Sequence, residues 1–337
     1  MNFYILTFKK KIIISFLLIF SGIIILDVIL YLYADMKTSK ITYKGNKFNK
    51  LKHFTLNNPI NKDMIFIGSS KTIFHISTNQ FKEKDIEVFN LGISGAQYED
   101  YPSLISEVVK FKPKKIVISL SINRFYDKLK IPKLPAIEEL FIYYNIDKIR
   151  FIHSIMKWIE NKHTFLTYSE IIFLKIKSFY NKFNNSTDIK HINTNNTDYK
   201  SLADCKVFDI QYRDNNGAVM KCTNGDGILV GNNLETSTLI DTQLITIDKE
   251  SILYLKNIIQ NIKSKDIQPI IILEPILNNK YQYNLNDIKK YFSGIELIDF
   301  TNLQIKNKYW SDNSHLNYLG REKYTQVLID TLGERNE

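Results

Sequence analysis

The chain has 337 residues, of which 44% are hydrophobic and 24% charged, and its formal net charge is +10. These proportions are ordinary for a globular protein and exclude a disordered or fibrous chain. The positive charge forms no basic stripe with interleaved aromatic residues and no nucleic-acid-binding motif, so we do not expect a nucleic-acid partner.

The first predicted element is a transmembrane helix at 12–33. This apolar segment has about 20 residues, the length that a helix needs to cross a bilayer. Three lysines at 9–11 precede it, so residues 1–11 should stay in the cytoplasm. A cleaved signal peptide would have a shorter apolar core ending in small residues, whereas bulky residues continue here to Tyr33. We therefore expect a single-pass membrane protein whose later residues lie outside the cytoplasm.

A globular domain at 63–335 is predicted to follow a polar, lysine-rich linker at 34–62. Short, nearly continuous apolar runs within it predict strands that are buried on both faces. These runs are 64–67, 86–91, 115–120, 269–275 and 295–300. Helical spacing of apolar residues predicts helices at 98–111, 248–265 and 318–332. The alternation predicts an α/β fold, with a doubly wound, mainly parallel sheet in three layers.

Residues 128–245 are predicted to be a helical and irregular insertion between the third and fourth strands. Its first part, 136–183, is helical in pattern, and turn signals within 207–230 predict a hairpin. Such an insertion either forms a substrate surface or pads the sheet, and the sequence favours neither. Cys205 and Cys222 both lie in it. Outside the cytoplasm they could form a disulfide, but sequence separation leaves that open.

Polar residues that suit acyl transfer follow the ends of the predicted strands. Ser70 follows the first strand in Gly68-Ser69-Ser70, and His315 lies three residues after Asp312, beyond the last strand. A serine hydroxyl needs a base to take its proton, and the base needs an orienting partner. Because the carboxyl ends of parallel strands meet at one edge of a sheet, Ser70, His315 and Asp312 are predicted to form a catalytic triad. Ser69 is the competing nucleophile.

The order of these residues resembles the SGNH hydrolases, the superfamily that includes the GDSL esterases. Its four blocks match Ser70 in Phe-Ile-Gly-Ser-Ser, Gly95 in Asn-Leu-Gly-Ile-Ser-Gly, Asn123 in Leu-Ser-Ile-Asn, and His315 in Asp-Asn-Ser-His-Leu-Asn. The resemblance covers about 60–127 and 248–335. It departs from the family at Ser69, which replaces an acid. In the third block Ser121 replaces a glycine, and Arg124 replaces an aspartate.

The Gly-Ser-Ser form resembles envelope members of that superfamily, such as DltD-like proteins and polysaccharide O-acetylation factors, which one N-terminal helix also tethers. The resemblance implies a serine O-acetyltransferase or acetylesterase that needs no cofactor or metal. Its oxyanion hole would comprise the backbone N–H groups of Ser70 and Gly95 and the side-chain amide of Asn123. His75, which is close to both serines in sequence, is expected to be structural, and Glu274 at a strand end has no assigned role.

The implied partners are an acylated or acceptor polysaccharide of the cell envelope and a multi-span membrane acyltransferase that supplies the acetyl group. The implied location is the bacterial inner (cytoplasmic) membrane, with the globular domain periplasmic or extracellular. Two alternatives stay open at this point. One is an esterase or lipase on small or lipid esters, and the other is an inactive SGNH-fold binding or scaffold protein.

Overall fold

The structure is a computed structural model. It describes residues 14–22, 25, 50, 62–130, 152–153, 155–156, 199–213, 217–234, 243–244, 246–279 and 281–333. The chain divides into two compact units, 1–41 with 155–193, and 42–154 with 194–337. The strands and the candidate site described below all belong to the second unit.

The transmembrane helix predicted over 12–33 is not supported by the structure. No helix within the described residues is both long and apolar enough to cross a bilayer. Of the predicted span, residues 14–22 and 25 are described, and they are helical. The rest of the span lies outside the described residues, as do nearly all of the linker 34–62 and of the predicted helical region 136–183.

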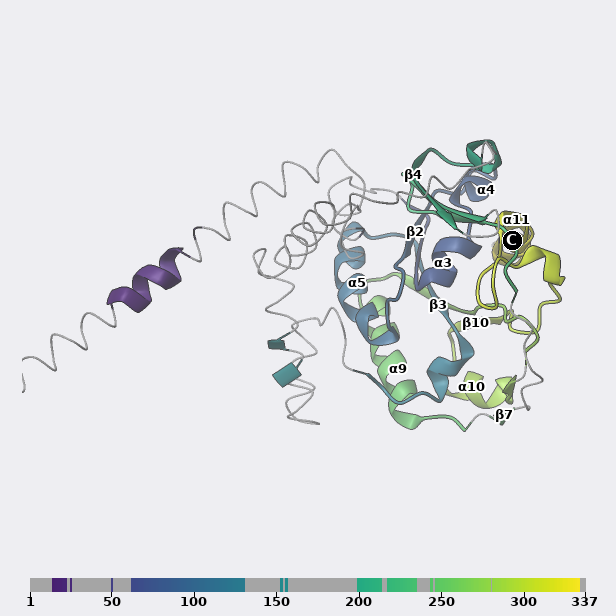
Figure 1. Cartoon of the computed structure of the whole chain (residues 1–337). Coiled ribbons are helices and arrows are strands. Elements are labelled where there is room, and N and C mark those ends of the chain that lie inside the picture. The colour runs from purple at the N-terminus through teal and green to yellow at the C-terminus, as the bar shows by residue number, and fades with distance from the viewer. Residues whose placement is uncertain are drawn as a thin grey trace, which may run out of the picture. The chain divides into compact units, whose positions relative to one another are not determined.

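Five parallel strands form the central sheet, and each lies where an apolar run predicts it (Figure 1). The strands are β1 (Met64–Gly68), β2 (Val88–Gly92), β3 (Lys115–Leu120), β8 (Gln268–Leu273) and β10 (Glu296–Asp299). Their order across the sheet is β10-β8-β3-β1-β2. Because β1 lies between β2 and β3, the carboxyl ends of these three strands are neighbours at one edge of the sheet.

Helices cover both faces of the sheet, as the doubly wound prediction requires. The odd-numbered residues of β1 join a core with α5 (Tyr101–Val108) and α9 (Lys249–Lys263). Its even-numbered residues pack with α11 (Tyr318–Gly333). Figure 1 shows α5 and α9 on one side of the strands and α3 (Ser70–His75) and α11 on the other. Successive strand residues point to opposite faces, so two covered faces require continuous apolar runs.

All three predicted helices are confirmed, with local differences. The run 98–111 is η1 (Tyr98–Asp100), α5 and η2 (Val109–Phe111), and it ends before Pro113 as predicted. Asp248 caps α9 by accepting the N–H of Ser251 at 2.9 Å. The sequence does not predict the short helices. These are α3, α4 (Thr78–Lys82), α10 (Leu285–Tyr291), η3 (Ile122–Phe125), η4 (Tyr199–Leu202) and η5 (Asn307–Tyr309).

Within the described part of the insertion, residues 207–230 form a three-stranded antiparallel sheet, so the predicted hairpin is present and a third strand extends it. Its strands, in spatial order, are β4 (Val207–Arg213), β5 (Gly217–Cys222) and β6 (Gly227–Val230). The last has only four residues, too few to show a period in the sequence. A further parallel pair joins β7 (Gln243–Leu244) to β9 (Tyr281–Gln282). Cys205 and Cys222 form a disulfide with their Cα atoms 5.8 Å apart.

Candidate active site

Ser70 is the first residue of α3 and follows the carboxyl end of β1 after one intervening residue. That residue, Ser69, is the helix N-cap, and its side chain makes no capping hydrogen bond. The N–H of Ser70 lies in the first turn, where a helix offers no backbone acceptor. The buried side chain of Asn90 in β2 ties this region to the sheet, since it donates to the carbonyl of Thr72 at 2.8 Å.

The three residues of the predicted triad come together. His315 Nε2 is 2.8 Å from Ser70 Oγ, although the two residues are 245 positions apart. His315 Nδ1 is 2.9 and 3.1 Å from the two carboxylate oxygens of Asp312. With Nδ1 as donor to the carboxylate, Nε2 accepts the serine hydroxyl proton, and serine acyl transfer requires this arrangement. The contact to His315 is made by Ser70, so the geometry favours it over Ser69 as the nucleophile.

The loop 311–316 holds Asp312 and His315 in place through its own backbone. Asp312 Oδ1 accepts the N–H of Ser314 at 2.8 Å and that of His315 at 2.9 Å. The N–H of Ser311 donates to the carbonyl of His315 at 2.7 Å. One carboxylate therefore caps the turn and orients the imidazole, which explains the spacing of three residues between Asp312 and His315.

The Asp312 carboxylate is ionised at neutral pH. Burial raises its pKa, but the hydrogen bond and charge of His315, with the two backbone N–H donors, outweigh burial and lower the pKa to about 2. Arg213, the last residue of β4, places Nη1 3.9 Å from Asp312 Oδ2. The insertion therefore reaches the triad with a cationic side chain.

Gly95 and Asn123 lie after the two strands that flank β1. Gly95 has φ 68°, a left-handed conformation that glycine adopts without strain. Asn123 lies in η3 after β3, and its Nδ2 donates to Asp127 Oδ2 at 3.0 Å. Its Oδ1 is buried and has no hydrogen-bond partner within the described residues. Sheet order thus places both residues at the edge of the sheet that carries Ser70.

A buried pair of side chains beside the triad is not predicted from the sequence. His75, at the end of α3, has Nδ1 3.0 Å from Glu274 Oε2, and the side chains are 0% and 1% exposed. Lys71 is also missed, and burial lowers its pKa although the charges of Glu274 and Asp312 act in the opposite direction. One signal was available, because Glu274 places a charge at the end of a buried strand, at the edge where Ser70 lies.

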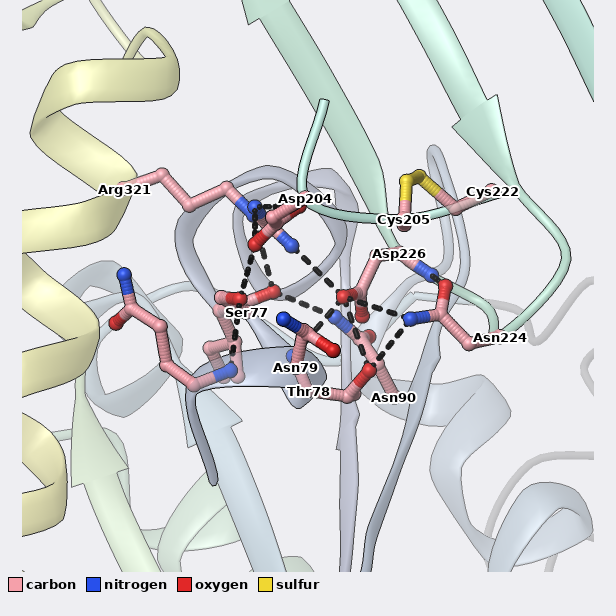
Figure 2. A network of polar contacts seen from close by, with 12 residues as sticks. Ser77, Thr78, Asn79, Asn90, Asp204, Cys205, Cys222, Asn224, Asp226 and Arg321 are labelled. Carbon is pink, nitrogen blue, oxygen red and sulfur yellow. Dashed lines mark hydrogen bonds and ion pairs between the residues drawn. A yellow bond between two sulfur atoms is a disulfide. The ribbon is translucent and has the colours of Figure 1, made fainter. Parts of the chain in front are cut away.

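A second polar network anchors α11, the helix that follows His315 (Figure 2). Arg321 Nη1 is 2.8 Å from both carboxylate oxygens of Asp204, and its Nη2 is 2.7 Å from Asp226 Oδ2. Thr78 donates to the same Asp226 oxygen from its backbone N–H at 2.9 Å and from its hydroxyl at 3.0 Å. Figure 2 shows the Cys205–Cys222 disulfide beside this network. The network ties α11, α4 and the insertion together.

A cavity of ≈ 570 Å³ lies away from the triad. Lys62 and Glu87, which precede β1 and β2, line it, so it is at the amino-terminal end of the strands. Its carboxylates are already paired, Glu87 with Lys62 and Asp204 with Arg321. We assign it no chemistry. Within the described part of the chain, no group of three or more His, Cys, Asp or Glu side chains could hold a metal ion.

Comparisons with known proteins add little information about this site. No protein-family model and no curated protein matches the chain. A solved structure from Streptococcus pneumonia, described as a "putative platelet activating factor", aligns with a TM-score of 0.38 and 11% sequence identity. The alignment covers 90% of this chain and 99% of that one. At this TM-score the likeness supports no conclusion about function, so the interpretation of the site rests on the contacts described above.

Proposed function

We propose that this chain is a serine-dependent acyl-transfer enzyme with Ser70 as nucleophile, His315 as general base and Asp312 as the residue that orients the base. One observation carries the proposal: Ser70 Oγ is 2.8 Å from His315 Nε2, while His315 Nδ1 is 2.9 Å from Asp312 Oδ1. Two segments that are distant in sequence supply the three residues, and each residue is in hydrogen-bond contact with the next.

In the first half-reaction Ser70 Oγ bonds to the carbonyl carbon of an ester, and its proton passes to His315 Nε2. The ester bond then breaks, and the leaving oxygen takes that proton. Asp312 stays ionised throughout because its pKa is about 2. It stabilises the imidazolium that forms, and it keeps the Nδ1–H tautomer that leaves Nε2 able to accept.

The negative oxygen of the tetrahedral intermediate needs donors that are in place before the reaction. We propose the backbone N–H groups of Ser70 and Gly95 and the side-chain amide of Asn123 for this role. Two arguments support it: the N–H of Ser70 has no helical acceptor, and β2 and β3 bring the other two residues to the same edge of the sheet. An amide carries two hydrogens, so Asn123 can donate to Asp127 and to a ligand together.

In the second half-reaction the acyl group passes from Ser70 to water or to another hydroxyl. On the resemblance of its four sequence blocks, we propose that the group is acetyl and that the substrate or acceptor is a cell-envelope polysaccharide. On the same resemblance, we propose a membrane tether at 12–33, an inner-membrane location and a multi-span membrane partner as acetyl donor.

The test of the catalytic proposal is labelling of the full chain by a fluorophosphonate, which reacts with activated serines. Wild type and Ser69→Ala should be labelled, and mass spectrometry should place the label on Ser70. Ser70→Ala and His315→Ala should lose both labelling and hydrolysis of p-nitrophenyl acetate. Ser69→Ala is the matched control because it removes the neighbouring hydroxyl. Equal labelling of wild type and Ser70→Ala would overturn the proposal, and the absence of labelling in wild type would favour an inactive binding protein.

A second experiment separates the substrates. The enzyme is offered an acetylated polysaccharide and a medium-chain lipid ester at equal ester concentration, and Ser70-dependent release of each acid is measured. Faster deacetylation of the polysaccharide supports the envelope function, whereas faster release of the fatty acid favours a lipase.

A further inference from the structure

The short helix α3 contacts the loop 311–316 at both of its ends. Ser70 is its first residue and His75 its last, about 7.5 Å apart along the helix axis. Ser70 Oγ contacts the imidazole of His315, and His75 Nε2 accepts the backbone N–H of the next residue, Leu316, at 3.1 Å. The positions of the nucleophile and the base relative to each other are therefore held by one helix and by two neighbouring residues of the loop.

These contacts determine the tautomer of His75. A backbone N–H can only donate, so Nε2 of His75 carries no proton and accepts from Leu316. The ring is then protonated at Nδ1, which donates to Glu274 Oε2 at 3.0 Å. Burial lowers the pKa of His75, although Glu274 acts in the opposite direction, which agrees with a neutral ring. If Nε2 carried the proton, its N–H group would face the N–H group of Leu316, and two donors cannot form a hydrogen bond.

The partner of His75 is itself held in place. Ser119 Oγ in β3 donates to Glu274 Oε1, and Thr72 Oγ1 in α3 donates to Ser119 Oγ at 2.9 Å. Burial raises the pKa of Glu274, but effects that favour the ionised carboxylate, of which the hydrogen bond from His75 is the largest, outweigh burial and lower it. The ionised carboxylate thus joins α3 to the sheet at two points, through His75 and through Ser119.

We propose that the buried pair His75–Glu274 positions His315 for proton transfer with Ser70. The inference rests on the proposed function and goes beyond the triad. Neither residue contacts a reacting atom, so both are positioning residues. Without the His75 acceptor, the N–H of the fully buried Leu316 loses its partner, and the loop must shift to satisfy it. Because His315 is the preceding residue, that shift changes the distance from Nε2 to Ser70 Oγ.

Two variants of His75 form a matched pair. In His75→Gln the side-chain oxygen reaches the position of Nε2 and can accept from Leu316. In His75→Asn the shorter side chain reaches the position of Nδ1, so it can contact Glu274 but cannot accept from the N–H of Leu316. For p-nitrophenyl acetate, we expect His75→Asn to lower kcat about 10- to 100-fold with KM unchanged, because the base is misplaced. His75→Gln should restore most of kcat. Equal kcat values for the two folded variants would overturn the proposal.

A second measurement needs no activity and no variant. Long-range ¹H–¹⁵N NMR of the histidine rings in wild type should show His75 neutral and protonated at Nδ1, and the Leu316 amide should be protected from hydrogen exchange. A ring protonated at Nε2, or an unprotected Leu316 amide, would overturn the inference even if His75→Asn fails to fold. Absence of any Ser70-dependent acylation in wild type would instead refute the proposed function, so the two failures are distinguishable.

Discussion

At the scale of single residues, Asp312 links the proposed triad to acid stability. Its pKa falls from an ordinary 3.8 to about 2 in the folded chain, so the folded state binds this proton less tightly than the unfolded state. Its contribution to the free energy of unfolding is therefore fully present above about pH 4 and is lost as pH falls through about 2. The shift corresponds to about 1–2 kcal/mol after allowance for solvent screening, since the side chain is 32% exposed.

We predict that Asp312→Asn removes this pH-dependent contribution. The free energy of unfolding of wild type minus that of Asp312→Asn should be larger at pH 6 than at pH 2.5, by about 1 kcal/mol, because part of the contribution remains at pH 2.5. Urea unfolding at the two pH values measures the difference. Asp330→Asn is the control, because Asp330 is exposed on α11 and accepts a hydrogen bond from Gln326 at 2.7 Å. A pH-independent difference for Asp312→Asn would contradict the prediction.

Asn123 carries the second prediction at this scale. If its amide donates to the oxyanion, Asn123→Ala should lower the acylation rate of Ser70 about 10²–10³-fold, the cost typical of losing one such donor. Asp127→Asn is the control, because it keeps a side chain that can accept from Asn123 Nδ2 and should leave the rate near wild type. Stopped-flow acylation by p-nitrophenyl acetate measures both. An unchanged rate in a folded Asn123→Ala variant would remove the residue from the site.

The triad could be predicted from the sequence, whereas the pair beside it could not. Ser70 and His315 each follow a predicted strand, and parallel strands bring their carboxyl ends together whatever the separation in sequence. His75 offers no such signal, because a histidine five residues after a serine is also typical of a helix that only packs on a sheet. Its partner Glu274 is 199 residues away, and only the packing of α3 against the sheet brings the two together.

At the scale of elements, burial decides which parts of the fold the sequence reveals. The five core strands are apolar on both faces, and this gives runs that are distinct from amphipathic helices. The helices α3 and α4 have six and five residues, less than two helical turns, so they show no period. Tertiary contacts such as Asn90 to Thr72 hold α3 in place, and these contacts leave no local pattern.

Gly92, the last residue of β2, controls the position of α3. A Cβ atom at this position would lie 2.7 Å from the backbone N of Ile73 and 2.9 Å from the carbonyl O of Ser69. Both are backbone atoms of the turn that carries Ser70, so the turn would have to move. We predict that Gly92→Ala destabilises the fold by about 1–3 kcal/mol and slows acylation of Ser70.

Denaturant unfolding and fluorophosphonate labelling rates test the Gly92 prediction together. Gly333→Ala is the matched control, because a Cβ there has no atom within 4 Å and the residue ends α11. If Gly92→Ala is as stable as wild type and is labelled at the same rate, α3 tolerates the added Cβ atom and the prediction is wrong.

At the scale of the whole second unit, the insertion and the core are joined through charged contacts that composition does not reveal. Arg321 of α11 binds Asp204, which precedes β4, and Asp226, which precedes β6. Asp226 and the Arg321 side chain are both nearly inaccessible to solvent. Removal of one partner of a buried pair leaves an uncompensated charge, so such contacts hold one arrangement firmly. Cys205 lies next to Asp204 and Cys222 lies four residues before Asp226, so the disulfide covalently joins the two segments of the insertion that bind Arg321.

The disulfide gives the prediction at this scale. It joins Cys205 to Cys222 across a sequence separation of 17, and a loop of that size restricts the unfolded chain by about 3 kcal/mol. We predict that a reducing agent lowers the free energy of unfolding of wild type by about this amount. The double variant Cys205→Ala, Cys222→Ala should start near the lower value and show no response to the reducing agent, which makes it the control for other effects of the reductant. Urea unfolding with and without dithiothreitol measures all four states. Coincident curves for oxidised and reduced wild type would mean that the noncovalent contacts of Arg321 hold the junction without the disulfide.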